Sequence, residues 1–414
     1  MKILMIVERM PSRVGGSIRQ FGLIRELADR HQFSVACFAY PVDLAQLDDL
    51  RPYLHRLEVA PLPQPTMPQR SIWYWRWNAW WHTLFDPHPR RGRYPQMDVL
   101  RDRVRRMAQE QEFDIVQVHQ AYFAHLWPDT TIATLLDWPD IPSAYERLVM
   151  ERQTKATYRF AAWFEWKKMQ ALERRAARQF DLCTTTSDDD RTKLLRLAPD
   201  ARVLVVPNGV DLAYFQARSC DEDDASIVFV GSMDYAANVD AVLYFCRDIL
   251  PLVWRDRSDV RFVVVGYGPP PAVLALAEDP RISVTGQVED VRPYLERAAL
   301  VVVPLRFGSG VRNKILEAWA MGKAIVSTTL GAEGLGAMHQ ETIWLADQPH
   351  QFAAAILRLL SQESLRRQLG LMGRTFVTER YSWAAAGLRM ESAYDACLAA
   401  HHTPSQTPSL GRAH

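Results

Sequence analysis

A glycine loop between an apolar segment and a helix-like segment carries the residues best suited to chemistry. The run Gly308-Ser-Gly-Val-Arg-Asn-Lys-Ile-Leu-Glu317 follows the apolar stretch 300–304. Main-chain amides at the start of a helix attract phosphate oxygens. Arg312 and Lys314 add the positive charge that suits a diphosphate, and Glu317 can accept hydrogen bonds from ribose hydroxyls. The pattern predicts a clamp for a nucleoside diphosphate; the alternative is a plain strand–turn–helix connection with a solvated basic end.

An N-terminal glycine pair gives a second, weaker signal. Gly15 and Gly16 follow the apolar segment 3–7, and glycine lets the backbone approach a ligand closely. Ser17 can cap the helix that comes next. We therefore interpret this loop either as a contact to donor phosphates or sugar or as an ordinary strand-to-helix turn. It contains no GxGxxG pattern, which argues against a dinucleotide fold.

Further loops follow three apolar segments of the second half. Gly231 and Ser232 can lend amides and a hydroxyl to a phosphate. Gly266 and Val288 lie where a nucleobase would lie if the phosphates bind at 308–314, and backbone groups near Val288 can then read the base edge. For each of these loops the alternative is a simple turn. Asn238 is expected to cap the helix that follows Ser232.

The acidic run Ser187-Asp-Asp-Asp190 resembles a metal site only at first sight. It lies between a predicted strand and a predicted helix. Ser187 is a natural N-cap, and carboxylates are favoured in the first helical turn. We therefore interpret the run as helix capping and predict no metal site.

Short apolar runs alternate with helix-like segments along the chain, and these must position the loops. Several are continuous Val/Ile runs, typical of parallel strands covered on both faces. The predicted strands lie at 3–7, 33–40, 56–60, 115–119, 131–136, 181–186, 202–206, 227–230, 261–265, 282–285, 300–303 and 324–327. This alternation predicts an α/β fold with doubly wound sheets.

Turn residues at 207–211 and an acidic connector at 220–224 mark a boundary. We predict two Rossmann-like domains, 1–212 and 213–383, facing across a cleft, because ligands of such sheets bind beyond the carboxyl ends of the strands. The helical segment 383–400 is expected to pack back on the first domain. The polar, Pro-rich tail 401–414 is expected to be disordered.

Composition excludes several classes of protein. The chain is 48% apolar and 23% charged with a net charge of +1, so no charge excess indicates a nucleic-acid partner. Its five cysteines are scattered, which fits reduced thiols in a cytoplasm better than disulfides or a zinc site. The N-terminal segment has no signal-peptide pattern, and no apolar run reaches the roughly 20 residues of a membrane-spanning helix.

Two segments combine aromatic and basic residues. Five of the 13 tryptophans lie in 71–81. The stretch 145–180 looks helical, and within it residues 147–180 include nine Lys/Arg and three Glu. Such mixtures suit the surface of an anionic membrane. The alternative is that the aromatic rings pack into the domain and the basic face is merely solvated. The first interpretation predicts a cytoplasmic protein that attaches peripherally to the inner face of a membrane.

The motifs taken together resemble the retaining GT-B glycosyltransferases of family four. The resemblance spans about 1–395 and rests on motifs in the family's order: Val206-Pro-Asn-Gly-Val-Asp211, Phe229-Val-Gly-Ser-Met-Asp234, Val265-Gly-Tyr-Gly268, Pro304, the 308–317 loop and Gly331-Ala-Glu-Gly334. It implies transfer of a sugar from a nucleotide sugar with retention at the anomeric carbon. It implies no metal and no other cofactor, because protein cations and helix dipoles act on the diphosphate.

The resemblance also implies roles for single residues. Glu317 matches the second Glu of the family's Glu-x7-Glu pattern, which holds the ribose, whereas Ser309 stands in place of the first Glu. Amides at Ser309, Gly310 and Val311 are expected to take over that sugar contact. Arg312 and Lys314 stand in for the Arg and Lys that many members carry after the first strand of the donor domain. Gly16 matches the N-terminal glycine loop.

The acceptor side departs from the family pattern. Pro139 stands where many members have a His just before an Asp, and Asp140 is retained. Asp140 is expected to orient or deprotonate the acceptor hydroxyl; its alternative is an Asx turn. His119, at the end of segment 115–119, is a rival. The expected acceptor is a glycan, a lipid-linked saccharide or another apolar molecule, as in bacterial polysaccharide or glycolipid biosynthesis.

Two other functions remain open for such a sequence. A nucleotide-sugar epimerase of the same fold would form product from the donor alone. A non-catalytic nucleotide-sugar binding protein is suggested by Pro139 and Ser309, which replace expected catalytic residues.

Overall fold

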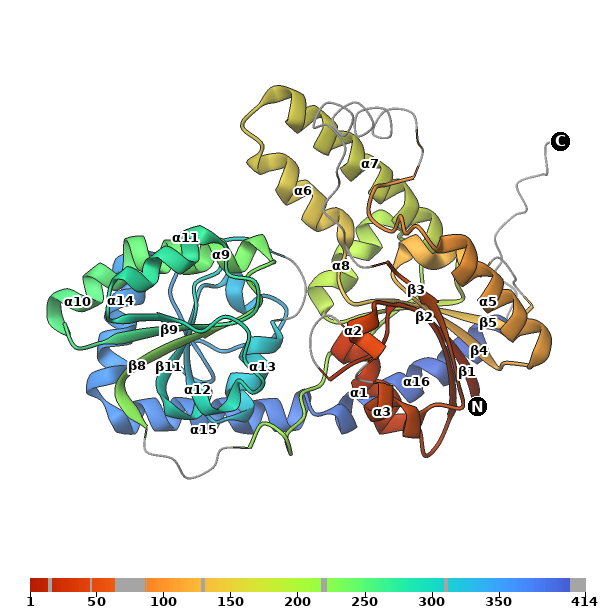
Figure 1. Cartoon of the computed structure of the whole chain (residues 1–414). Helices are drawn as coiled ribbons and strands as arrows, with labels where there is room; N and C mark the ends of the chain where they lie inside the picture. The colour runs from red at the N-terminus through yellow and green to blue at the C-terminus, as the bar shows by residue number, and fades with distance from the viewer. Residues whose placement is uncertain are drawn as a thin grey trace. The chain divides into compact units, whose positions relative to one another are not determined.

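Two parallel sheets form the framework of the chain (Figure 1). The computed structural model describes residues 1–13, 17–44, 47–63, 86, 88–127, 131–216, 222–308 and 312–402. It divides into one unit made of Met1–Val206 and the chain from Gly387 onward, and a second unit, Pro207–Ala386. The chain thus crosses between units at 206/207, where the sequence predicted a boundary after 212, and again within its last helix.

The first unit has a sheet in the order β3-β2-β1-β4-β5-β6-β7, with every neighbouring pair parallel. Its strands are β1 (Lys2–Arg9), β2 (Gln32–Ala39), β3 (Arg56–Pro61), β4 (Ile115–His119), β5 (Ala133–Trp138), β6 (Leu182–Thr185) and β7 (Val203–Val205). Its helices are α1 (Ile18–Leu27), α2 (Pro41–Leu44), α3 (Leu47–Leu50), α5 (Met97–Glu110), α6 (Pro142–Arg152), α7 (Ala156–Gln179), α8 (Asp188–Leu197) and most of α16 (Trp383–His402).

Successive side chains of these strands point to opposite faces of the sheet. Leu4, Val116 and Leu136 belong to the apolar core cluster on the face covered by α5, α7 and α8. The alternate positions Gln117, His119 and Asp137 therefore face α1 and α16 (Figure 1). The Tyr394 hydroxyl of α16 donates to Gln117 Oε1 at 2.7 Å.

Asp137 is a fully buried carboxylate in the middle of this second face. Arg19 of α1 donates to both of its oxygens at 2.8 Å, and the Thr184 hydroxyl of β6 donates at 2.6 Å. Burial alone would raise the pKa of Asp137, but the charge and hydrogen bonds of Arg19, with help from His119, hold it far below its usual range. A buried charge that has lost its partner is costly. The network therefore fixes α1 against β5 and β6.

The second unit has a sheet in the order β10-β9-β8-β11-β12-β13, again parallel throughout. Its strands are β8 (Asp223–Val230), β9 (Arg261–Val265), β10 (Ile282–Val284), β11 (Ala298–Val303), β12 (Ala324–Ser327) and β13 (Trp344–Leu345). Its helices are α9 (Ala236–Tyr244), α10 (Leu250–Asp256), α11 (Pro271–Leu274), α12 (Arg292–Arg297), α13 (Asn313–Ala320), α14 (Pro349–Ser361) and α15 (Glu363–Arg380).

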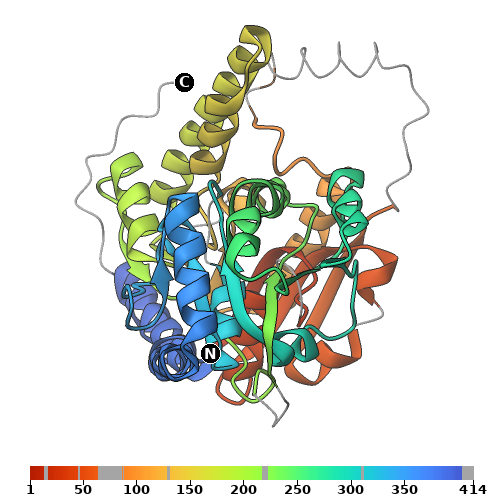
Figure 2. The same ribbon diagram turned by 90° about the vertical axis from the view of Figure 1, so that its left-hand side faces the viewer.

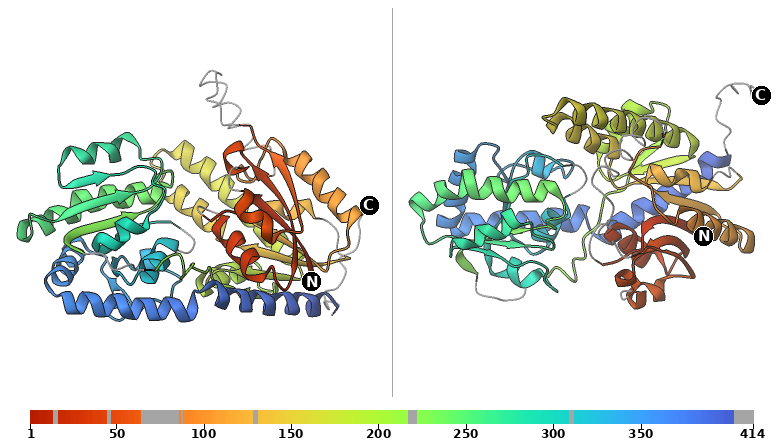
Figure 3. Two further views of the ribbon diagram at one scale, coloured as in Figure 1. Left: turned by 60° about the horizontal axis from the view of Figure 1, so that its bottom comes forward. Right: turned by 45° about the horizontal axis from the view of Figure 1, so that its top comes forward.

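Helices cover both faces of this sheet, with α9, α10 and α14 on one side and α12, α13 and α15 on the other (Figures 1 and 3). The strands are buried almost completely, as β11 illustrates with six buried residues in a row. Continuous apolar strands between two helical layers are what the Val/Ile runs predicted. The α/β architecture with two doubly wound sheets is thus confirmed.

Most elements match their predicted positions, and the differences have physical causes. The two-residue strand β13 escaped prediction because it is too short to form a pattern. The stretch 145–180 was expected as one helical segment but forms two helices, because the chain turns at 153–155. The interpretation of the acidic run as a cap is confirmed, since the Ser187 side chain accepts from the Asp190 amide at 3.1 Å.

Helix α16 extends two residues into the predicted tail, and 403–414 lie outside the described residues. It joins the first unit at Gly387, where an added Cβ would lie 2.8 Å from a Glu26 side-chain carbon of α1. Glu391 accepts a hydrogen bond from Arg30 and pairs with His31 at 3.1 Å. Within the part of the chain that the structure describes, no helix combines the length and the apolar character needed to cross a membrane.

We expect Asp137→Ala to lower the free energy of unfolding of the first unit by about 3–5 kcal/mol, because it removes the carboxylate that pairs with the buried Arg19 charge. Urea unfolding followed by circular dichroism measures this. Asp98→Ala, which removes an ion pair whose carboxylate is 90% exposed, is the matched control and should cost about 0.5 kcal/mol or less. Equal effects of the two substitutions would contradict the anchoring role of Asp137.

Candidate functional site

The candidate site of the second unit lies where the connectivity of its sheet reverses. From β8 the chain adds β9 and β10 on one side, then returns to place β11, β12 and β13 on the other. The carboxyl ends of β8 and β11 are therefore neighbours whose following loops diverge, and α/β sheets bind their ligands at such a point. Gly231 and Ser232 follow β8, and the loop containing Gly308 and Arg312 follows β11.

Lys314, in the first turn of α13, points back to the end of β8. Its Nζ donates to Asn238 Oδ1 at 2.6 Å and lies 4.1 Å from the centre of the Phe229 ring. Asn238 in turn donates through Nδ2 to the Ser232 carbonyl at 2.6 Å. Helix α9, through Asn238, and the loop after β8, through the Ser232 carbonyl, thus hold the Lys314 ammonium of α13 in one orientation.

Two glycines make room for this arrangement. A Cβ on Gly231 would lie 2.7 Å from Lys314 Nζ and 2.8 Å from Asn238 Nδ2, so any side chain there would displace the ammonium. Gly308 has a φ of +127°, which L-residues rarely adopt, and an added Cβ would lie 3.3 Å from Arg312 Nη1. Gly231 thus makes room for Lys314 at the end of β8, and Gly308 makes room for Arg312 in the loop after β11.

Lys314 and Glu317 are electrostatically coupled along α13. The pKa of Lys314 is lowered to about 7, mainly by burial and also by the nearby Arg312 charge, while Glu317 opposes the shift. Burial likewise raises the pKa of Glu317 to about 7, against the opposing charge of Lys314. Arg312 itself is almost fully buried. An anion bound here would favour the charged form of Lys314, because an opposite charge raises the pKa of an amine.

The prediction that Asn238 caps α9 is wrong. The helix begins at Ala236, with Tyr235 at the N-cap position, so Asn238 lies inside the first turn. Its side chain instead connects Lys314 to the loop after β8. In that loop the Ser232 hydroxyl donates to Asp234 Oδ1 at 3.0 Å. Sequence reasoning missed Asn238 as an orienting residue because its partner is about 80 positions away.

The loops after β9 and β10 continue this edge of the sheet. A Cβ on Gly266 would lie 1.9 Å from the Gly231 carbonyl oxygen, so the loops after β8 and β9 are in direct contact. The Gly266 amide donates to the Gly286 carbonyl at 3.2 Å. Val288 follows β10 and packs partly against the core. The structure thus brings Gly231, Ser232 and Gly266 together and leaves Val288 at the outer strand.

Several predicted contacts lie outside the described residues. These are Gly15 and Gly16 of the N-terminal loop, Ser309, Gly310 and Val311 of the clamp loop, and the tryptophan segment 71–81. Ser17 stands at the N-cap position of α1, but its side chain makes no capping hydrogen bond. Its Oγ lies 3.1 Å from the Ser12 hydroxyl.

In the first unit, Asp140 follows β5 and is partly exposed. Gln120 Nε2 donates to Asp140 Oδ1 at 2.6 Å, and Arg91 Nη2 lies 3.8 Å from the other oxygen. Gln120 has a φ of +77°, an uncommon value for a residue with a side chain. Its Oε1 is buried with no hydrogen-bond partner among the described residues. Asp140 is therefore held by a side chain that follows the neighbouring strand β4.

His119 ends β4 next to this pair. Its Nδ1 lies 2.9 Å from Asp137 Oδ2, so the anchored carboxylate orients the ring. Gln20 of α1 lies 3.3 Å from the same nitrogen. The other nitrogen, Nε2, is buried and has no hydrogen-bond partner among the described residues. An imidazole fixed on one side and unpartnered on the other can hold or move a proton, so His119 remains a rival to Asp140.

Two further carboxylates near this edge were not predicted. Glu8, at the end of β1, accepts from the Tyr94 hydroxyl and, at 2.5 Å, from the Tyr122 hydroxyl. Glu173 of α7 is fully buried and accepts from the Ser143 amide of α6 at 2.7 Å. Burial raises the pKa of Glu173 to about 8, against the hydrogen bonds of Ser143. Glu8 could have been identified as a carboxylate directly after the apolar run 3–7, whereas Glu173 lies among the charged residues of 167–178, where no local pattern marks it.

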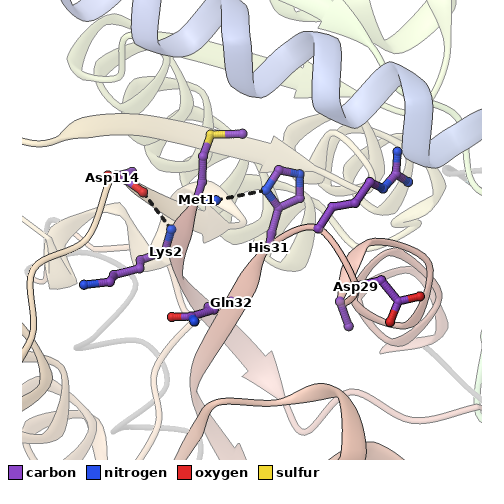
Figure 4. Close-up of a pocket in the computed structure, with 8 residues that line it drawn as sticks. Met1, Lys2, Asp29, His31, Gln32 and Asp114 are labelled. Atoms are coloured by element: carbon purple, nitrogen blue, oxygen red, sulfur yellow. Dashed lines mark hydrogen bonds between the residues drawn. The ribbon is translucent and has the colours of Figure 1, made fainter.

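Hollows elsewhere on the surface do not add to the site. One lies at the amino ends of β1 and β2, where the Lys2 amide donates to Asp114 and His31 lies beside Met1 (Figure 4). That edge is opposite to the carboxyl ends of the strands. A second hollow, beyond β12, is lined by Thr329, Leu330, Glu333 and Asp347. Among the described residues, no group of three or more His, Cys, Asp and Glu side chains is arranged to hold a metal ion.

Two family models match the chain. The model described as Glycosyl transferases group 1 matches residues 224–362, and the model described as Glycosyltransferase Family 4 matches residues 83–214. One subunit of the phosphatidylinositol N-acetylglucosaminyltransferase from Arabidopsis thaliana is 25% identical over 236 residues. The match covers 52% of this chain and 49% of that protein, so the chain matches about half the length of that relative.

Solved structures match nearly the whole chain. Sucrose-phosphate synthase from Thermosynechococcus elongatus has a TM-score of 0.71 at 16% identity, covering 96% of this chain and 99% of that one. Anabaena HepE, solved in complex with UDP and glucose, has a TM-score of 0.67 at 13% identity, covering 95% and 99% of the two chains. At these identities the likeness shows the fold, which is the GT-B fold of two Rossmann-like domains.

We expect the reactivity of Lys314 towards acetic anhydride to rise with a midpoint near pH 7, because only the neutral amine is a nucleophile and burial lowers its pKa. Mass spectrometry of peptides labelled across a pH series measures the midpoint. Arg312→Gln should raise the midpoint, since it removes the nearby like charge. A midpoint above about pH 9 in the unsubstituted protein would contradict the described burial of the ammonium.

Proposed function

We propose that this chain, which belongs to the glycosyltransferases of group 1 and family 4, moves a sugar from a nucleoside-diphosphate sugar to a hydroxyl acceptor with retention at the anomeric carbon. One observation carries the proposal. Asn238 holds Lys314 at the turn after β8, beside Gly231, where any side chain would displace the Lys314 ammonium. Arg312 stands directly before the same helix, α13. Two cations at a helix N-terminus suit a diphosphate.

The donor is proposed to bind along the carboxyl edge of the second sheet. The diphosphate lies against Arg312, Lys314 and the loop of Gly231 and Ser232. Glu317, three residues after Lys314 on α13, accepts from the ribose hydroxyls. The amides of Ser309, Gly310 and Val311 contact the sugar, and the base extends towards Gly266 and Val288. HepE was solved with UDP, and uridine is therefore the first nucleotide to test.

We infer that the protein's own charges act on the departing diphosphate without a metal ion. In the transfer step the bond from the anomeric carbon to the diphosphate breaks, and negative charge develops on the leaving oxygens. Arg312, Lys314 and the α13 dipole stabilise that charge, and preorganised electrostatic stabilisation of this kind is usually the largest catalytic term. The acceptor oxygen bonds to the same face of the carbon, and its proton passes to a diphosphate oxygen.

On the acceptor side we propose Asp140 as the residue that orients the acceptor hydroxyl. It is partly exposed, and Gln120 holds one of its oxygens while the other lies 3.8 Å from Arg91. His119 is the alternative, because its outer nitrogen has no partner among the described residues. A glycan or a lipid-linked saccharide of bacterial polysaccharide or glycolipid synthesis is the proposed acceptor, and the site of action the cytoplasm.

Two other functions make different products. An epimerase would form a new nucleotide sugar from the donor alone. A binding protein would be stabilised by the nucleotide but would form nothing. Both are distinguished from transfer by incubating the protein with donor in the presence and absence of acceptors.

The proposed function predicts selective stabilisation by one nucleoside diphosphate without added metal. We expect UDP, among UDP, GDP, ADP, CMP and dTDP, to raise the unfolding temperature by about 5 °C at saturating concentration, because a ligand of the folded state stabilises by mass action. Gly231→Val should abolish the shift, because its side chain would meet Lys314 Nζ, while Ala354→Val, which introduces the same residue at an exposed position of α14, should retain it. No shift with any nucleotide would refute the clamp.

Transfer is then assayed with the sugar donor of the nucleotide that binds. NMR of the anomeric proton of the product shows whether the configuration is retained.

Substitutions on the two sides of the reaction should have separable effects. We expect Arg312→Ala to lower kcat about 100- to 1000-fold and Arg312→Lys less, since charge on the leaving group is stabilised less well. Arg306→Ala, which removes an arginine paired with Asp240, is the matched control and should leave kcat unchanged.

On the acceptor side, Asp140→Asn should lower transfer while keeping the UDP-induced thermal shift. Transfer at the unsubstituted rate by Asp140→Asn, with loss of transfer in His119→Gln, would move the acceptor role to His119.

A further inference from the structure

Helices α6 and α7 form a hairpin that extends away from the first sheet (Figures 1 and 2). Its base is fixed. Met169, Ala176 and Ala177 of α7 are buried, and Glu173 accepts from the Ser143 amide of α6 at 2.7 Å. The hairpin therefore extends from a packed base, and its far end takes no part in that packing.

The far end of the hairpin has no buried side chain before Glu165 of α7. The first buried residue of α7 is Glu165, and the helix begins at Ala156. At a rise of about 1.5 Å per residue, roughly 15 Å of helix precedes that point. The preceding residues 151–155, at the turn between the helices, are exposed or half-buried. We call residues 151–168 the hairpin tip.

Aromatic rings lie on the surface of the hairpin tip. Tyr158, Phe160 and Trp163 are 43%, 51% and 40% exposed. Phe160 stacks on Trp163 with ring centres 6.2 Å apart, and both rings contact Phe164 edge-on at 5.2 and 5.3 Å. Large apolar side chains that gather on a surface usually mark a binding site. Here the rings pack on one another and remain partly open to solvent.

The charge of the hairpin tip is positive. Residues 151–168 contain five Lys/Arg and two Glu. Of the two acids, Glu165 is buried and accepts from the Arg90 amide at 2.8 Å, and Glu151 pairs with Arg147 at 2.8 Å. Lys155 and Arg159 are exposed beside the rings, and Lys167 lies 4.3 Å from the Trp166 ring centre. Any partner of this surface must accept both aromatic rings and positive charge.

We propose that the hairpin tip docks this protein on the surface of an anionic lipid bilayer. Aromatic rings favour the headgroup region, and Lys and Arg beside them are attracted to anionic headgroups. A second copy of the same tip is disfavoured, because two basic surfaces repel each other. Both kinds of side chain act at the surface of a bilayer, so the attachment that we propose is peripheral. Asp140 lies two residues before α6, at the base of the hairpin, so docking of the tip would hold the proposed acceptor side about one helix length, roughly 16 Å, from the bilayer. This consequence alone rests on the proposed function.

The test is flotation of the full chain with vesicles of phosphatidylcholine containing about 30% phosphatidylglycerol, compared with phosphatidylcholine alone. We expect binding to the anionic vesicles at about 0.05 M salt and its loss at about 0.5 M, because salt screens the attraction. Phe160→Ala with Trp163→Ala, and separately Lys155→Glu with Arg159→Glu, should each weaken vesicle binding about tenfold or more.

Matched controls remove similar groups elsewhere. Leu371→Ala with Met372→Ala takes two exposed apolar side chains from α15, and Arg255→Glu with Arg389→Glu makes the same charge change outside the hairpin. Both should bind vesicles as the unsubstituted chain does. All four sites are exposed, so circular dichroism should be unchanged. Binding that the tip substitutions leave intact, no binding to anionic vesicles, or capture by an acidic protein or RNA in place of vesicles would each overturn the proposal.

Discussion

The position of one ammonium group organises the second unit's functional edge. Lys314 Nζ reaches the turn after β8 only because Asn238 accepts a hydrogen bond from it at 2.6 Å and because position 231 has no side chain. Burial there lowers the pKa of the amine to about 7, so the charge is costly in the free protein. An anionic ligand removes that cost by stabilising the charged form. In the function that we propose, the diphosphate of the donor is that anion.

The same rule of placement governs the first unit. The order in which its strands are connected also reverses, between β1 and β4. Its polar side chains lie at the carboxyl ends of the central strands, where α/β sheets bind their ligands. The buried Asp137 carboxylate, paired with Arg19, fixes the ring of His119 on the sheet face covered by α1 and α16. Gln120, after the same strand, fixes Asp140. Each unit therefore builds an orienting hydrogen bond behind its candidate functional group.

Unlike the candidate sites at the sheet edges, the hairpin of α6 and α7 lies largely outside the core of the first unit. Its buried residues lie towards its base. Glu173 and the buried residues after it tie the base to the first unit. The aromatic and basic residues before Glu165 instead remain on the surface. From the sequence, the aromatic and basic residues of 147–180 could either bind a membrane surface or pack into the domain. In the structure the second half of this segment packs into the first unit, and the first half is exposed.

The sequence by itself determined the fold class and the strand, glycine loop and helix that carry the candidate clamp residues, since buried parallel strands are apolar runs and strand–glycine–helix turns are local patterns. Strands 115–119, 261–265 and 324–327 were predicted to the residue. Only the tertiary structure decided that Asn238 orients Lys314, that Arg19 pairs with Asp137, and that Gln120 holds Asp140. Those contacts join residues 20 to 118 positions apart, and no local pattern encodes them. They follow from strand order, which brings distant carboxyl ends together at one edge of each sheet.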